Sequence, residues 1–155
     1  MISASFGNAP ASMTFTRMAE AVDRLAGNID EEVLVQTGNT AYEFRHASTV
    51  RFLTHDQMQD TMKKASIVIL QGGWGTISEA IALGKRIVSI PRRVGQECNH
   101  PQEEVVRTLE KQGCLLGCYD TATLPEIIET ARTYMFKPLP RGESGEIINA
   151  FINVL

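Results

Sequence analysis

An uninterrupted apolar segment near the middle of the chain constrains the fold more than any other feature. Residues 67–70 read Ile-Val-Ile-Leu, with no polar residue at alternate positions. A strand with this pattern is typical of a parallel sheet that helices cover on both faces. The segment at 77–83 is also apolar almost all round, so it predicts a buried helix. The middle of the chain therefore indicates a strand–loop–helix unit of an α/β fold.

Strand-like and helix-like segments alternate along the chain. Short apolar runs predict strands at 2–6, 33–36, 50–53, 67–70, 87–90 and 115–118. Apolar residues at helical spacing predict helices at 13–27, 77–83, 101–113 and 124–135, and Asp56 is expected to cap a further short helix. Because no block of strands stands alone, we expect a Rossmann-like, mostly parallel sheet sandwiched by helices.

Length and composition limit the number of domains. The sequence has 155 residues, of which 43% are apolar, and this suffices for one domain that needs no disulfide or metal to fold. We expect this domain at residues 1–136, followed by a proline-containing linker at 137–143. Residues 144–155 predict a last helix with an apolar stripe, which docks either on its own domain or on a partner subunit.

Charge and cysteine content exclude several classes of protein. Lys and Arg number 15 against 18 Asp and Glu, so the chain offers no basic surface for a nucleic-acid backbone. No apolar run approaches the ~20 residues of a membrane span, and the N-terminal residues lack the features of a signal peptide. Three cysteines without a Cys-x-x-Cys motif indicate buried thiols in a reducing compartment. We therefore expect a cytoplasmic protein.

The loop after the central strand carries the strongest functional signal. It reads Gly-Gly-Trp-Gly-Thr from Gly72 to Thr76 and opens a predicted helix. Glycines let the backbone approach a ligand, and a helix N-terminus favours an anion. Because parallel sheets bind ligands beyond the carboxyl ends of their strands, we expect a phosphate group here, with Thr76 as a hydroxyl donor or as the N-cap. The alternative is a tight turn without a ligand.

Two common phosphate loops do not fit this segment. A Walker A loop requires a Lys that is absent, and the dinucleotide fingerprint requires a glycine where Ser78 stands. Glu79 is the one charge on the apolar helix, one turn beyond Thr76. Its two carboxylate oxygens suit a pair of ribose hydroxyls, and the alternative is an exposed helix edge.

Residues 72–93 carry a longer pattern. They read Gly-Gly-Trp-Gly-Thr-Ile-Ser-Glu-Ala-Ile-Ala-Leu-Gly-Lys-Arg-Ile-Val-Ser-Ile-Pro-Arg-Arg, and further matching segments lie at 6–8, 35–39 and 99–102. This sequence resembles the donor-binding half of family 28 glycosyltransferases. It is similar in particular to separate subunits of two-piece enzymes, namely the catalytic subunit of dolichol-linked GlcNAc transferase and bacterial exopolysaccharide glycosyltransferase subunits. The resemblance implies half of a GT-B fold, with residues 1–136 as the nucleotide-sugar-binding domain.

The resemblance implies a role in binding UDP-sugar for individual residues. Those that would hold the diphosphate are Gly72, Gly73, Gly75 and Thr76 and, from across the cleft, Gly7 and Asn8. Glu79 would bind the ribose hydroxyls. Phe52 and Leu53 would receive the uracil. Asn99 and Gln102 would reach the sugar hydroxyls. No Asp-x-Asp motif is present, so we expect no metal, and no cofactor apart from the UDP-sugar donor substrate.

Four further residues have open roles. Arg92 and Arg93 either add positive charge to the diphosphate or to a sugar carboxylate, or they form a solvated basic pair. Trp74 either packs against a neighbouring loop or stacks on the donor or the partner. Gln71 stands where the family often has His, and its amide forms hydrogen bonds without carrying charge.

The resemblance also implies an inverting transfer shared between two chains. Such a transfer needs a base, and His46, His55 and His100 qualify only by residue type. In two-piece enzymes the acceptor-binding half supplies the base, so we expect activity only with a partner. That partner would be a membrane-anchored subunit that presents a lipid-linked acceptor, and it would hold this chain at the membrane surface.

Two other functions compete with this one. The Gly-Gly-x-Gly-Thr-x-x-Glu pattern also resembles phosphoribohydrolases that cleave nucleoside monophosphates. That family expects an Arg-Lys pair shortly before the motif, where this chain has Met62-Lys63-Lys64. A non-catalytic nucleotide-binding module is the third possibility.

Overall fold

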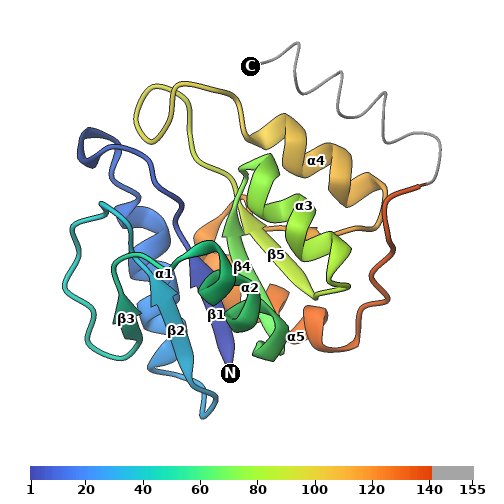
Figure 1. Ribbon diagram of the computed structural model, residues 1–155, viewed down its shortest axis with the longest axis horizontal. Helices are drawn as coiled ribbons and strands as arrows, with labels where there is room; N and C mark the ends of the chain where they lie inside the picture. Colours follow the sequence, from blue (N-terminus) through green and yellow to red (C-terminus); the bar gives the residue numbers. More distant parts are fainter. Residues whose placement is uncertain (141–155) are drawn as a thin grey trace.

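Six parallel strands form one sheet with helices on both faces in the computed structural model, which describes residues 1–140 (Figure 1). The strand order is β3-β2-β1-β4-β5-β6, and every neighbouring pair is parallel. The strands are β1 Ile2–Ser5, β2 Val33–Gln36, β3 Ser48–Val50, β4 Ile67–Gln71, β5 Ile87–Ile90 and β6 Leu116–Gly117. The helices are α1 Thr16–Ala26, α2 His55–Lys64, α3 Trp74–Ala82, α4 Glu103–Lys111 and α5 Leu124–Thr133, with short 3-10 turns at Ala11–Met13 and Thr121–Thr123. The predicted Rossmann-like α/β sandwich is confirmed.

Strand β4 shows why the sheet needs two helical layers. Its residues Ile67 and Ile69 pack in the core that α1 and α5 cover, whereas Val68 and Leu70 pack in the core that α2, α3 and α4 cover. All four residues are fully or almost fully buried. The run without polar alternation is therefore a strand buried on both faces, as predicted.

Several element boundaries differ from the prediction by a few residues, and three of these differences bear on the loops beyond the sheet. The third strand ends at Val50, so residues 51–53 form the connection to α2. Helix α2 is capped by Thr54 rather than by Asp56, because Thr54 and Gln57 form a reciprocal capping box. Helix α3 begins three residues earlier than expected, with Gly73 at its N-cap, so Thr76 lies within its first turn.

The strand order places a crevice above β1 and β4. The chain builds β2 and β3 on one side of β1 and then returns to the other side with β4. At such a switch point the connections from neighbouring strands diverge, and the opening lies at the carboxyl ends of the strands. The loop after β1 and the glycine-rich loop after β4 therefore face each other across this opening.

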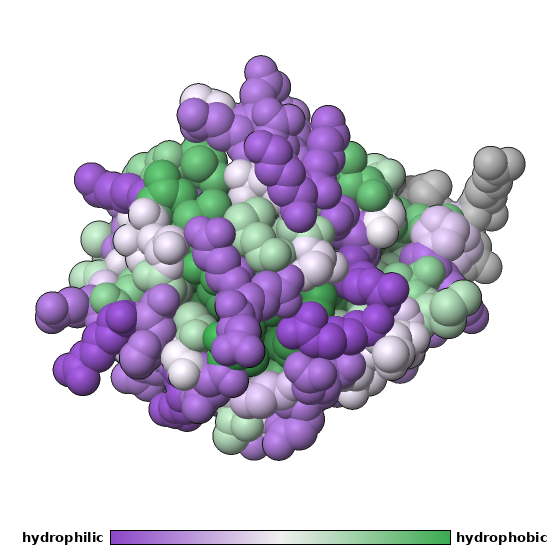
Figure 2. Space-filling view, turned by 90° about the horizontal axis from the view of Figure 1, so that it is seen from below, coloured by the Kyte–Doolittle hydropathy of each residue, from purple (hydrophilic) through white to green (hydrophobic). Residues whose placement is uncertain are grey.

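The opposite edge of the sheet, at the amino ends of the strands, is predominantly hydrophilic (Figure 2). Glu31 lies there and accepts hydrogen bonds from Arg132 Nη1 at 3.1 Å, from the N-terminal ammonium at 2.9 Å and from the Ser66 hydroxyl. Burial alone raises the pKa of Glu31, but these bonds outweigh it and lower the pKa to about 2. The charged carboxylate therefore ties β1, β4 and α5 together at this edge.

The lowered pKa of Glu31 predicts that the folded protein loses stability in acid. Because its folded-state pKa lies below the ordinary value of 4.5, its contribution to stability is complete above about pH 4.5 and is lost as the pH falls towards 2. We expect the Glu31→Gln variant to lose stability less steeply than the wild type between pH 5 and 2. Urea unfolding across this range, followed by circular dichroism, measures the slope. Equal acid slopes in the two proteins would contradict the assignment.

The last described residues run back along the domain. In the predicted linker, the Lys137 backbone N–H donates to the Gly113 carbonyl at 2.9 Å, and Leu139 packs against the core beside α4. The predicted helix at 144–155 and linker residues 141–143 lie outside the described residues. Within residues 1–140, none of the helices has the length and hydropathy needed to cross a membrane.

Candidate functional site

A cleft of about 360 Å³ opens at the carboxyl ends of β1, β2 and β4. Its lining includes six residues predicted from the sequence: Gly7, Asn8, Phe52, Leu53, Thr76 and Glu79. It also includes six that were not predicted as site residues: Ser5, Gln36, Thr54, His55, Met58 and Gln71. Three of these six, Ser5, Gln36 and Gln71, are the last residues of β1, β2 and β4. A polar residue that ends an apolar strand is thus the sequence signal that would have found them.

Two larger hollows lie outside this cleft. One, of about 580 Å³, lies between α1 and the β2–β3 connection and is lined mainly by charged residues, including His46. There Asp23 accepts hydrogen bonds from three successive backbone N–H groups, at residues 45–47, so its carboxylate holds that loop in place. The other, of about 530 Å³, lies beside the start of α4, and its lining includes Arg92, Arg93 and Gln102. Neither is at the switch point of the sheet, where a ligand is expected.

The loop after β1 approaches the end of β4 very closely. Gly7 has a positive φ of 75°, which favours glycine. A Cβ atom at this position would lie 2.0 Å from the side-chain nitrogen of Gln71. Gly7 is therefore favoured by its backbone conformation, and a side chain there would displace the Gln71 amide from its hydrogen bonds with Arg92 and Gln102.

The three glycines of the glycine-rich loop differ in whether the surrounding structure requires glycine at their positions. A Cβ on Gly72 would lie 2.7 Å from Gln102 Cβ, so the packing of α4 requires glycine there. Gly73 is the N-cap of α3 and has no side chain that could bond to the first turn. A Cβ on Gly75 would meet no atom within 4 Å, so nothing in the described protein requires glycine at that position. The open space beside Gly75 lies in the first turn of α3.

Trp74 is the first residue of α3. It is half-buried and packs against the core formed by α2, α3 and α4. This packing against the core differs from the expected contact with a neighbouring loop, and a role of Trp74 in stacking on the donor or the partner stays a prediction.

Glu79 faces the cleft one turn into α3. Its side chain is 35% exposed, and its two oxygens bond to different residues of α2: Oε1 lies 3.2 Å from His55 Nε2, and Oε2 accepts from Gln59 Nε2 at 2.9 Å. The carboxylate is thus held in a fixed orientation by protein groups. Each oxygen has a second lone pair, so the carboxylate can still accept hydrogen bonds from a ligand.

The far end of the cleft is formed by residues that follow β3. Phe52 is 47% exposed, and the Arg51 guanidinium lies 5.5 Å from the centre of its ring. The Leu53 backbone N–H donates to Gln36 Oε1 at 2.8 Å, and Gln36 Nε2 donates to Ser5 Oγ at 3.2 Å. Gln36 therefore fixes the backbone at Leu53, next to an aromatic surface that is open to solvent.

Arg92 lies inside the protein instead of in the cleft. It is 3% exposed, and its guanidinium donates to the carbonyls of Phe6, Met13 and Glu97 at 2.5–2.9 Å and to Gln71 Oε1 at 2.6 Å. Burial lowers the pKa of Arg92, and the nearby Glu97 partly restores it. The expected contact between Arg92 and the diphosphate does not match this position, because the guanidinium is occupied in joining the loops that follow β1 and β5.

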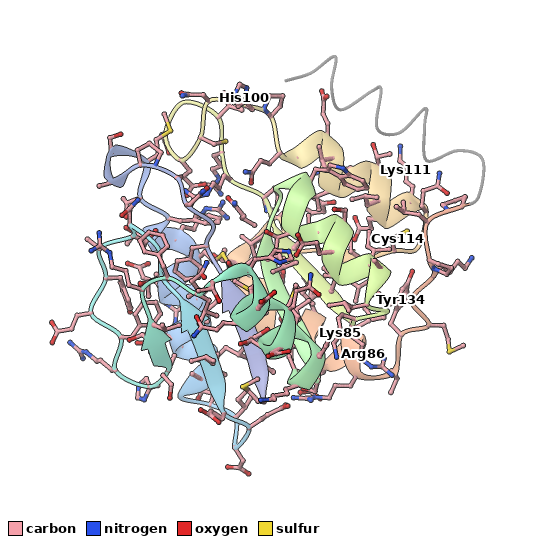
Figure 3. All side chains as sticks on the ribbon, in the orientation of Figure 1. Lys85, Arg86, His100, Lys111, Cys114 and Tyr134 are labelled. Atoms are coloured by element: carbon pink, nitrogen blue, oxygen red, sulfur yellow. The ribbon has the colours of Figure 1, made fainter. Side chains whose placement is uncertain are left out.

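The remaining predicted residues lie on the β5–α4 connection, outside the cleft lining. Arg93 and Asn99 are exposed, and His100 lies at the outer end of this loop, at the edge opposite Lys85 and Arg86 (Figure 3). Gln102 is the N-cap of α4, and its side chain bonds to the backbone of the glycine-rich loop. Of the three histidines in the sequence, His55 is the one that lines the cleft.

A known protein family matches most of this chain. The family described as the glycosyltransferase family 28 C-terminal domain matches residues 9–145. No curated protein matches the chain significantly in sequence.

Several solved glycosyltransferase structures have the same fold. The chain is similar to the glycotransferase of kitacinnamycin (TM-score 0.65, 13% identity, 99% of this chain and 38% of that one). It is also similar to SnogD from Streptomyces nogalater (TM-score 0.57, 18% identity, 97% and 43%) and to MurG from Acinetobacter baumannii (TM-score 0.58, 14% identity, 99% and 49%). At these identities the likeness shows the fold, and the chain spans less than half the length of each of these structures.

Proposed function

Because the chain belongs to the glycosyltransferase family 28 C-terminal domains, we propose that it binds the UDP-sugar donor of an inverting glycosyltransferase. The sugar is transferred to a lipid-linked acceptor, in exopolysaccharide or glycolipid assembly. The acceptor is bound by a separate, membrane-anchored subunit. One observation carries the proposal: the first turn of α3 and the Glu79 carboxylate line the same cleft, at the switch point of the sheet.

Three regions of the cleft suit the diphosphate, the ribose and the uracil of a nucleoside diphosphate. The N-terminal N–H groups and dipole of α3 stabilise the diphosphate beside Thr76 and Gly75, with Gly7 and Asn8 on the opposite wall. Glu79, one turn further along α3, accepts hydrogen bonds from the ribose diol. The uracil ring lies towards the exposed ring of Phe52.

The same groups stabilise the leaving group of the transfer. When the bond between the sugar and the diphosphate breaks, negative charge grows on the diphosphate, and the helix N-terminus stabilises it. A base must also take the proton of the acceptor hydroxyl. His55 lines the cleft but is paired with Glu79, so we assign the base to the acceptor-binding subunit. The purified chain should therefore show no transfer alone, and robust turnover without a partner would contradict this assignment.

A ligand screen tests the proposed donor class. The structure of the glycosyltransferase VinC, which has the same fold (TM-score 0.54, 14% identity), contains dTDP. A thermal-shift screen should therefore compare UDP, UDP-sugars and dTDP with AMP and NADP. We expect UDP and UDP-sugars to raise the melting temperature more than dTDP, because Glu79 would bind the ribose diol, and more than AMP, because AMP has a single phosphate instead of a diphosphate. Stabilisation by AMP without UDP would favour the phosphoribohydrolase reading instead.

Gly75 offers a test in which stability and binding change in opposite directions. Alanine fits there without a clash, and it should stabilise α3 by about 0.5–1 kcal/mol. The added methyl group occupies the space that we assign to the diphosphate, so UDP affinity should fall by about tenfold. Urea unfolding and calorimetry measure the two effects. A Gly75→Ala variant that binds UDP as tightly as the wild type would contradict a diphosphate at this position.

A further inference from the structure

The side chain of Gln102 connects two loops. Its Oε1 accepts hydrogen bonds from the Gly72 N–H and from the Arg92 N–H, each at 2.9 Å. An amide oxygen has two lone pairs, so both are used. Its Nε2 donates to Gln71 Oε1 at 3.3 Å. The side chain is therefore oriented by three partners within the protein.

These contacts belong to a network of three side chains. Gln71 Oε1 accepts from Arg92 Nε at 2.6 Å as well as from Gln102 Nε2, so Gln71, Arg92 and Gln102 join the ends of β4 and β5 to the start of α4. The approach of α4 is so close that only glycine fits at position 72, beside Gln102. Gln102 is not among the residues that line the cleft at Glu79.

We propose that Gln102 is a positioning residue, which holds the glycine-rich loop in the geometry that binds the diphosphate, and not a ligand of the donor sugar. This inference rests on the proposed function. The two roles differ in their consequences. A ligand of the sugar affects UDP-sugar but not UDP. A residue that holds the Gly72 amide affects both to the same extent, because both present the same diphosphate.

Two variants separate the roles. Gln102→Met has similar length but neither accepts nor donates a hydrogen bond, whereas Gln102→Glu keeps the oxygens that accept from the Gly72 and Arg92 N–H groups. The matched control is Gln112→Met, the same change at the other end of α4. Calorimetry gives the dissociation constants of UDP and of UDP-GlcNAc for each protein. Hydrogen exchange of the Gly72 amide reports on the loop without any ligand, and circular dichroism confirms folding.

We expect Gln102→Met to weaken UDP and UDP-GlcNAc by the same factor, about tenfold. It should also speed exchange of the Gly72 amide, whereas Gln112→Met stays close to the wild type in both measurements. Gln102→Glu keeps an acceptor for the Gly72 N–H, so exchange of that amide should stay slow. Loss of UDP-GlcNAc affinity alone, or unchanged exchange at Gly72 in Gln102→Met, would overturn the inference. If the wild type binds no UDP, the proposed function fails, and the Gly72 exchange result still decides whether Gln102 holds the loop.

Discussion

Replacement of Arg92 by methionine is expected to lower the free energy of unfolding by about 3–5 kcal/mol. The guanidinium is buried and joins three backbone carbonyls to Gln71, and it lies 4.5 Å from the ring of Phe15. Methionine keeps much of the apolar packing, but it leaves these acceptors buried without a donor. Urea unfolding at neutral pH, followed by circular dichroism, measures the change.

The neighbouring residue provides the control. Arg93 is exposed, so Arg93→Met should change the free energy of unfolding by no more than about 0.5 kcal/mol. Arg92→Lys keeps a positive charge but cannot reach all four acceptors, so its stability should lie between those of the wild type and Arg92→Met. If Arg92→Met unfolds at the same urea concentration as Arg93→Met, the structural role assigned to Arg92 is wrong.

The second large effect concerns binding. Replacement of Glu79 by alanine should weaken UDP binding by about 1.5–3 kcal/mol, or roughly 10- to 150-fold, the range for hydrogen bonds to a charged group. The half-exposed position of Glu79 means that the fold should survive the change. Calorimetry gives the affinity, and Glu126→Ala, an exposed carboxylate in the first turn of α5, is the control. Unchanged UDP affinity in a folded Glu79→Ala variant would refute the ribose contact.

The fold could be predicted from the sequence because most strands and helices have their own local sequence pattern. Strands β2 and β5 were predicted with the bounds that the structure shows, since each is a short apolar run that ends at turn-forming residues. Helix α3 was predicted to start too late, because Trp74 and Gly75 do not resemble a helix start. Its true N-cap, Gly73, makes no side-chain hydrogen bond to the first turn, so the usual Ser, Thr, Asp or Asn signal of a helix start is missing.

The site could be predicted only in part, because the positions of two predicted site residues depend on contacts that are distant in sequence. Thr76 and Glu79 follow from the rule that ligands bind at the carboxyl ends of strands, and Gly7 follows from the family resemblance; the structure places all three in one cleft. Arg92 instead contacts the carbonyl of Phe6, 86 residues away, and Gln102 contacts Gly72 across 30 residues. No local pattern distinguishes a basic residue that binds phosphate from one that binds carbonyls.

The difference in affinity between UDP and 2′-deoxy-UDP, measured by calorimetry on the wild type and on Glu79→Ala, tests the central claim most directly. If Glu79 binds the ribose diol while the start of α3 binds the diphosphate, the wild type should prefer UDP by about tenfold or more. The variant should bind both nucleotides with similar, weaker affinity. The same preference for UDP in both proteins would contradict the claim, because another group would then be reading the 2′-hydroxyl.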